Sequence, residues 1–137
     1  MPFQLTLQPD FLRVVVTGRL TREEVIALGL EVRKQEETST RLPNRLTDVS
    51  GVEITELSAD DVREFARRRR EARYPNPFRN AIVAPQPLQF GYARMFQTLA
   101  EHPDIATQVF NDEAAALAWL REPVPVPSPA AADQARG

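Results

Sequence analysis

Residues 45–61, RLTDVSGVEITELSADD, contain the pattern on which the fold depends. The apolar positions of 46–49 predict a short strand, which Gly51 interrupts. Ser58 then supplies a residue type preferred at a helix N-cap, and Asp61 follows three residues later, which is the spacing of a capping box. The stretch therefore predicts a strand, a loop and the beginning of a helix.

The N-terminal side of this stretch predicts a hairpin followed by a helix. Within residues 3–17, an alternating apolar segment is followed by a break at Pro9 and then by a valine-rich run. Thr21 and Glu24 have the capping-box spacing, so a helix of roughly four turns should begin near Arg22. The chain thus enters residues 45–61 from a ββα unit.

On the C-terminal side, strands and helices continue to alternate. Pro75 ends the central helix, and the pattern then predicts a strand over 80–84, a helix over 88–99, a strand over 105–110 and a helix over 112–120. The buried stripe expected on the third helix consists of Leu88, Tyr92, Met95, Phe96 and Leu99. The order ββαβαβαβα predicts a single-domain α/β fold, with a mixed sheet packed against helices.

Length and composition define the class of protein. The 137 residues suit one domain, predicted over 1–121, and the Pro/Ala-rich residues 122–137 predict a disordered tail. A net charge of −2 provides no overall positive field for nucleic acid, and the absence of cysteine excludes disulfides and thiol chemistry. No apolar run is long enough for a transmembrane segment, so we expect a cytoplasmic protein.

The segment 48–60, DVSGVEITELSAD, resembles the central strand, loop and helix start of STAS domains, the anti-sigma-factor-antagonist family. The positions that fit the family pattern are Asp48, Ser50, Gly51 and Val52. In that family, a partner anti-sigma kinase phosphorylates the first of two adjacent serines at the helix start. Leu57 stands at that position here, and Ser58 matches the second serine. Glu56 and Ala59 replace a family aspartate and glycine, so the resemblance implies a domain without the usual serine phosphoswitch.

Residues 81–103 and 109–120 resemble uncharacterised, stand-alone bacterial STAS-like or SpoIIAA-like proteins, a grouping also related to CRAL-TRIO lipid-transfer domains. The two resemblances together cover roughly residues 1–121. They imply a STAS/SpoIIAA-like fold and a non-enzymatic regulatory or protein-interaction module. The alternative is a small-ligand carrier that binds a lipid-like or anionic molecule. An enclosed apolar pocket would favour the carrier, and a packed core with an exposed patch would favour the module.

Few side chains are suited to catalysis. His102 is the only histidine, and its place at the expected end of a helix, before Pro103, is favourable for electrostatic reasons alone. Asp60 and Asp61 similarly suit the first turn of a helix. Five scattered glycines form no phosphate-binding loop, and no set of ligands indicates a metal. We therefore predict no enzyme activity, catalytic residue, cofactor or metal.

The arginines are the least ordinary feature of the composition. Between Arg63 and Arg79, seven arginines stand against two glutamates, which leaves a local charge of +5. Helical winding places Arg69 and Arg73 toward the sheet, and together with Arg79 they are candidates for binding an anion. The alternative is that they pair with carboxylates or carbonyl groups inside the fold. Nucleic acid is not expected, because aromatic residues do not interleave the basic run.

Three residues are candidates for docking a partner. Ser58 and Asp61 begin the central helix, and Phe90 lies off the apolar stripe of residues 88–99. Phe90 would mark a surface for a protein partner or for self-association into a homodimer. The alternative is that its ring folds back onto Pro85 or Pro87 at the start of that helix. The sequence identifies neither the partner nor the ligand.

Overall fold

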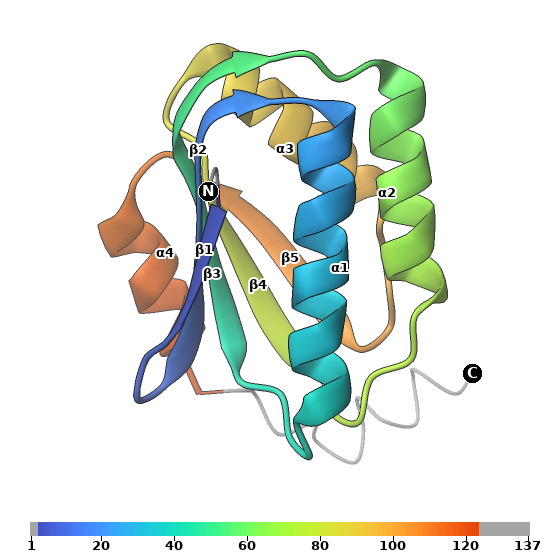
Figure 1. Cartoon of the computed structure of the whole chain (residues 1–137). Helices are drawn as coiled ribbons and strands as arrows, with labels where there is room; N and C mark the ends of the chain where they lie inside the picture. Colours follow the sequence, from blue (N-terminus) through green and yellow to red (C-terminus); the bar gives the residue numbers. More distant parts are fainter. Residues whose placement is uncertain (1–2, 124–137) are drawn as a thin grey trace, which may run out of the picture.

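The computed structural model describes residues 3–123 as five strands and four helices in one α/β unit (Figure 1). The elements are β1 (Phe3–Leu7), β2 (Phe11–Leu20), α1 (Arg22–Thr38), β3 (Asn44–Thr55), α2 (Ala59–Glu71), β4 (Phe78–Val83), α3 (Pro87–Leu99), β5 (Ile105–Phe110) and α4 (Glu113–Leu120). This order confirms the predicted ββαβαβαβα fold. The tail predicted over 122–137 lies outside the described residues from residue 124 onward.

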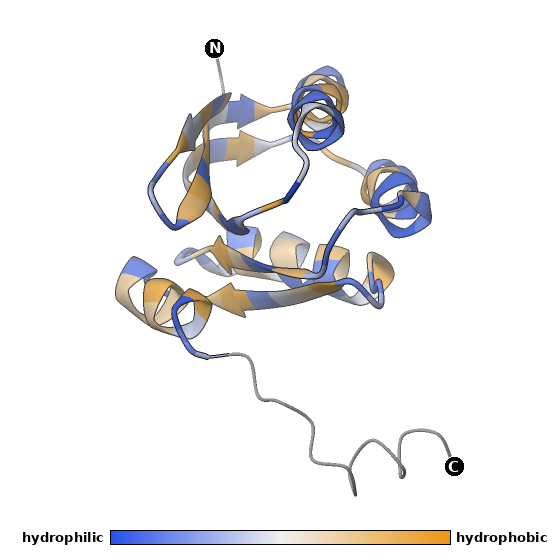
Figure 2. Cartoon of the chain, turned by 90° about the horizontal axis from the view of Figure 1, so that it is seen from below, coloured by the Kyte–Doolittle hydropathy of each residue, from blue (hydrophilic) through white to orange (hydrophobic). Residues whose placement is uncertain are grey.

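The sheet has the strand order β1-β2-β3-β4-β5, with β1 antiparallel to β2 and all other neighbours parallel. Each parallel pair is connected by a helix. Helices α1, α2 and α3 cover one face of the sheet, whereas α4 packs on the opposite face (Figures 1 and 2). Among residues 3–123, no helix has the length and apolar character needed to span a membrane.

Apolar side chains fill both faces of the sheet. On the face covered by α1 to α3, alternate residues of β2 pack against Leu28 and Val32 of α1, and Ile82 of β4 packs near Ala93 of α3. The cluster on the α4 side consists of Phe11, Leu46, Ala81, Val83, Ala116 and Leu120. Because β4 is covered on both faces, its consecutive residues from Asn80 to Val83 are all buried, as is typical of a central parallel strand. β3 shows such two-sided burial only at Arg45 and Leu46, near its beginning.

β3 differs from the short, interrupted strand that the sequence predicts, because it continues for 12 residues through Gly51. The pairing of β2 with β3 shifts register beside Gly51, and a Cβ atom at this position would lie 2.8 Å from Cγ2 of Thr17. In β2, Gly18 comes directly after Thr17 and has a φ of 75°, a conformation that L side chains rarely adopt. Gly51 therefore permits a close approach of two strands and does not end one.

The stripe predicted for α3 is wrong at its first position. Leu88 is 62% exposed, whereas Gln89 is buried and Phe90 packs against the cluster around Ile82. Nε2 of Gln89 donates to the carbonyl oxygen of Val52 at 2.6 Å, which fixes the first turn of α3 against β3. This polar contact rotates the first turn relative to the orientation that hydrophobicity alone predicts.

Candidate functional site

A buried carboxylate lies at the centre of the candidate site. Val25, Leu28 and Val32 form the inward stripe of α1, and Glu36 continues it one turn later with only 3% of its surface exposed. α1 is 17 residues long, more than the roughly four turns predicted, because its polar final turns remain helical around this buried contact. Glu36 therefore occupies a core position in a segment whose composition suggests a solvated helix end.

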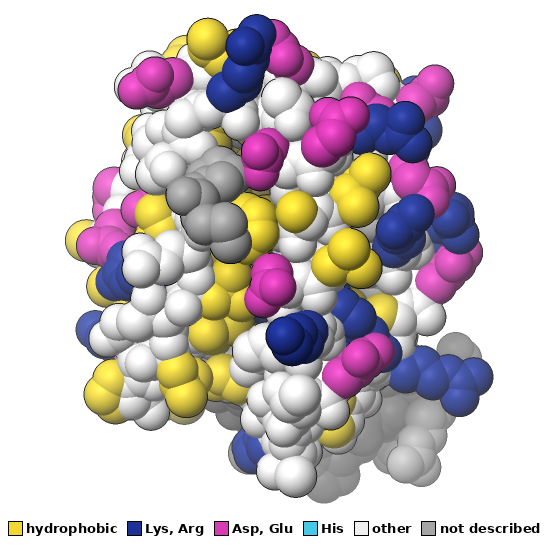
Figure 3. Space-filling view, viewed as in Figure 1, with side chains coloured by type: hydrophobic (Ala, Val, Ile, Leu, Met, Phe, Trp, Pro, Cys, Tyr) yellow, Lys and Arg dark blue, Asp and Glu magenta, His cyan; other side chains and the backbone are white. Residues whose placement is uncertain are grey.

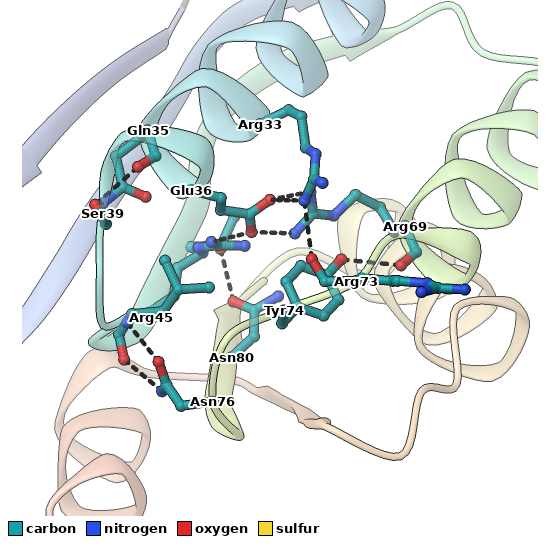
Figure 4. A network of polar contacts seen from close by, with 12 residues as sticks. Arg33, Gln35, Glu36, Ser39, Arg45, Arg69, Arg73, Tyr74, Asn76 and Asn80 are labelled. Carbon is teal, nitrogen blue, oxygen red and sulfur yellow. Dashed lines mark hydrogen bonds and ion pairs between the residues drawn. The ribbon is translucent and has the colours of Figure 1, made fainter.

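Two buried arginines approach Glu36 from different elements (Figure 4). Arg69 of α2 donates from Nη1 to Oε1 at 2.9 Å and from Nη2 to Oε2 at 2.6 Å. Arg45 of β3 donates from Nη2 to Oε2 at 2.8 Å. The three side chains join a helix, a strand and a second helix by charge-assisted hydrogen bonds, which are among the stronger kinds in proteins.

Burial and pairing affect the three ionisable groups differently. Burial alone would raise the pKa of Glu36, but the hydrogen bonds and charges of Arg69 and Arg45 outweigh it and lower that pKa. The pKa of Arg45 is lowered, because burial and the positive charge of Arg69 together exceed the opposing effect of Glu36. Burial also disfavours charged Arg69, yet its bidentate contact with Glu36 raises its pKa. Glu36 thus stabilises the charged form of Arg69 more than that of Arg45.

Aromatic and polar groups enclose the two arginines. The guanidinium of Arg45 lies 5.0 Å from the ring centre of Phe78, and that of Arg69 lies 5.4 Å from the ring centre of Tyr74. The hydroxyl of Tyr74 donates to the carbonyl oxygen of Arg69 at 2.9 Å, and burial raises the pKa of this phenol. Arg33 lies at the outer edge, with Nη1 3.6 Å from Oε1 of Glu36.

The structure does not bring together the three arginines predicted to bind an anion. Arg69 is buried but is occupied by Glu36, whereas Arg73 is exposed beyond the end of α2. Nη1 of Arg79 donates to the carbonyl oxygen of Trp119 at 2.6 Å, on the α4 side of the sheet. The prediction that Arg69, Arg73 and Arg79 share one anion pocket is therefore wrong, because the sheet and the end of α2 separate them.

Arg45 and Glu36 were missed by reasoning from sequence. Each had a local signal: Glu36 extends the spacing of an apolar helical stripe, and Arg45 directly precedes the fully buried Leu46 in a parallel strand. Neither signal predicts that the side chains of Glu36 and Arg45 contact each other. Their contact depends on the packing of α1 over the beginning of β3, which only the tertiary structure defines.

A cavity of about 170 Å³ lies between the sheet and helices α1, α2 and α3. Its middle is apolar and includes Phe65, Ile82 and Phe96, whereas Arg45 and Arg69 line it near the beginnings of the parallel strands. Asn80 of β4 lines the same end and accepts a hydrogen bond from the Thr47 hydroxyl at 2.8 Å. The cavity is therefore apolar along its length and cationic at one end.

The start of α2 forms a second candidate surface, at the opposite end of the strands. The side chain of Ser58 accepts from the backbone N–H of Asp61 at 3.1 Å, and the Asp61 carboxylate accepts from the backbone N–H of Ser58 at 3.0 Å. The predicted capping box is thus confirmed. The preceding Leu57 is held by Tyr92, whose hydroxyl donates to the Leu57 carbonyl oxygen at 2.7 Å.

The apolar residues exposed near this surface differ from those predicted. Phe90 is partly buried against the Ile82 cluster, so the exposed docking role envisaged for its ring is not supported by its position. Leu88 and Ile54 are instead 62% and 51% exposed at the adjacent ends of α3 and β3. The first turn of α3 is fixed to β3 through Val52, so these two residues flank one junction.

The ring of His102 forms hydrogen bonds only with backbone groups among the described residues. Its Nε2–H donates to the carbonyl oxygen of Ala72 at 2.9 Å, while Nδ1 accepts from the backbone N–H of Asp104 at 3.0 Å. Both ring nitrogens are therefore occupied by backbone groups, one at the end of α2 and one directly before β5. Within residues 3–123, no three side chains of the His, Cys, Asp or Glu types gather in a way that would hold a metal ion.

Comparisons with known proteins identify the fold. No family model matches the chain, and no curated protein matches it. Among solved structures, the chain is similar to an uncharacterised DUF3478-family protein from Shewanella loihica PV-4, whose crystal structure has a SpoIIAA-like fold. The TM-score is 0.57 and the identity is 20%, and the match covers 86% of this chain and 91% of that chain. The predicted STAS/SpoIIAA-like fold is therefore confirmed.

Proposed function

We propose that this chain, with its SpoIIAA-like fold, is a non-enzymatic STAS-like interaction module that docks a protein partner at the junction of β3, α2 and α3. The observation that carries the proposal is the exposure of Leu88 and Ile54 beside the capped start of α2. Apolar side chains at the centre of an interface are typical of protein partners. A bacterial, cytoplasmic setting belongs to the same proposal and rests on the resemblance and the cysteine-free composition.

The capping box supports a module without the serine phosphoswitch. Ser58 uses its hydroxyl oxygen as a helix cap, and a phosphate there would add negative charge next to Asp60 and Asp61. Leu57, at the position of the family's phosphorylated serine, has no hydroxyl group. We therefore propose that docking depends on the shape and apolar character of this surface rather than on its phosphorylation.

The charge near the junction indicates what the partner contributes. Segment 48–61 contains five acidic residues and no basic one. Arg19 and Arg63 pair with Glu56 and Asp60, whereas Glu53 has no ion pair among the described residues. A partner that presents an apolar side chain with a basic neighbour would complement Leu88 and this carboxylate.

Site-specific photocrosslinking in the native host tests the docking surface. A photoreactive phenylalanine analogue at position 88 should give a discrete protein adduct, which Ile54→Asp should abolish. The matched control is the same analogue at Leu30, which is also 62% exposed but lies on α1. Absence of an adduct at position 88, or the same adduct from both positions, would contradict the proposal. A self-adduct would identify the homodimer as the assembly.

The second candidate function is a small-ligand carrier, and the cavity beside Arg45 is the observation that favours it. Its chemistry matches the amphipathic or anionic molecule expected of a carrier. Native mass spectrometry of protein purified from its own host provides the test. A retained small molecule of constant mass would support a carrier, and ligand-free protein from every growth phase would argue against it.

A further inference from the structure

The charges buried between α1, α2 and β3 do not cancel. Glu36 contributes one negative charge, whereas Arg45 and Arg69 contribute two positive charges, and the exposed fractions of these two arginines are only 6% and 7%. The nearest further cation, Arg33, lies 3.6 Å from Glu36, but its own charge is matched by the exposed Glu37 at 3.2 Å. The three buried groups therefore keep an excess charge of +1, and an uncompensated buried charge is costly.

Hydrogen-bond donors are also in excess at this point. A guanidinium has five N–H donors, yet within residues 3–123 Arg45 makes one hydrogen bond, to Glu36. Its Nε atom is buried and has no hydrogen-bond partner among these residues. Buried polar atoms without partners are rare in native proteins, and an additional acceptor would satisfy the guanidinium.

The cavity provides space for such an acceptor. Arg45 and Asn80 line it at the same end, and the side-chain oxygen of Asn80 is already occupied by Thr47, which leaves its amide nitrogen as a donor. Val25, Phe65 and Arg69 line both this cavity and the surface groove between α1 and α2. These three side chains form the partition through which a ligand would enter.

Size and charge together limit the chemical class of the ligand. The volume of about 170 Å³ is close to that of an engineered apolar cavity of about 150 Å³ that binds benzene. A monocarboxylate supplies one negative charge against the excess of +1, and its planar oxygens fit a guanidinium fork. A phosphate dianion would exceed that charge, and the long chains of a membrane lipid would exceed the volume.

We infer that this cavity binds a small amphipathic monocarboxylate, with its carboxylate on Arg45 and Asn80 and its apolar body between Phe65 and Phe96. Arg69 remains on Glu36 and holds the cationic end in place. The inference rests on the carrier candidate and specifies its ligand class. It is independent of docking at Leu88, which lies outside the cavity lining.

The test uses the full-length protein with benzoate as the probe and benzyl alcohol as its uncharged counterpart. Calorimetry should give a benzoate affinity at least about tenfold above that of benzyl alcohol, because hydrogen bonds to charged groups are the stronger ones. Inorganic phosphate should not compete. Equal binding of acid and alcohol, competition by phosphate, or no binding of benzoate would overturn the inference.

Two variants separate the cationic end from the rest of the protein. Arg45→Met should remove the preference for benzoate over the alcohol, whereas the exposed control Arg68→Met should preserve it. Should Arg45→Met not fold, intermolecular NOEs in the unmodified protein should connect the benzoate ring to Phe65, Ile82 and Phe96. NOEs to Ile26 and Leu30 of the outer groove instead would overturn the inference. Retained benzoate binding in Ile54→Asp would show that this site is separate from the docking surface.

Discussion

Helix α2 takes part in two arginine–glutamate networks that are made of the same groups but have opposite environments. On its outer side, Arg67 pairs with Glu64 and Glu71, and Arg68 pairs with Glu64. Charged side chains of both signs gather over this helix in the space-filling view (Figure 3). On its inner side, Arg69 makes two hydrogen bonds to Glu36 of α1. Adjacent residues of one helix therefore have different physical roles.

The difference shows how burial changes the contribution of a charged side chain to stability. Hydrogen bonds from Arg67 and Arg68 lower the pKa of Glu64 to about 2, but the side chain of Glu64 is 45% exposed, and water screens its interactions. Glu36 is withdrawn from water, so its partners must replace the lost hydration. The outer network is a solvated surface, whereas the inner network determines how α1, α2 and β3 fit together.

Removal of the buried negative charge should have the largest effect. Glu36→Gln leaves Arg45 and Arg69 buried without a negative partner, and we expect a loss of about 3–5 kcal/mol in the free energy of unfolding. Glu37→Gln is the matched control, since the side chain of Glu37 is exposed. Urea denaturation of both variants measures the difference. Similar small losses in the two would contradict the distinction between the networks.

Acid should weaken the inner network in a predictable direction. The folded pKa of Glu36 lies below its ordinary value of 4.5, so the folded state favours the charged form. Its contribution to stability is complete above the unfolded pKa and is lost as pH falls through the lower folded pKa. The stability difference between wild type and Glu36→Gln should therefore shrink in acid. A difference that stays constant down to acid unfolding would assign the effect to shape rather than charge.

A polar contact at the start of the same helix should have an intermediate effect. Ser58→Ala removes the cap that accepts the backbone N–H of Asp61, and we expect a loss of about 0.5–2 kcal/mol. Ser58→Asp retains a side-chain acceptor and serves as the control. Thermal unfolding followed by circular dichroism measures both. Phosphorylation of Ser58 in cells, with loss of the photocrosslink at position 88 in Ser58→Asp, would show that a serine switch remains.

Arg45→Met tests whether donors really are in surplus in the inner network. The variant loses one hydrogen bond to Glu36 but also removes the excess buried charge and the unpartnered Nε atom. These effects oppose each other, so the free energy of unfolding should stay within about 1 kcal/mol of wild type. A loss as large as that of Glu36→Gln would mean that Glu36 needs both arginines, so that Arg45 is not in excess.

The sequence predicted those parts of the molecule that depend on local chemistry. The caps at Thr21 and Ser58 lie where their residue types and spacing predict, and the order of elements follows. The orientation of α3 was missed because Gln89 bonds to a β3 carbonyl, and no helical periodicity records that contact. The contact of Glu36 with Arg45 was missed for a similar reason, since it requires α1 to pack across the sheet.

The smallest effect should come from the outer network. Arg67 lies between Glu64 and Glu71 on an exposed helix surface, and in Arg67→Ala its lost ion pairs are offset by the higher helix propensity of alanine. The melting temperature of Arg67→Ala should therefore match that of wild type within the error of calorimetry. Added salt should change both proteins equally, because the ion pairs that differ between them are already screened. A clear loss of stability in Arg67→Ala that disappears in high salt would show that the outer network also supports the fold, and the contrast between the two sides of α2 would then fail.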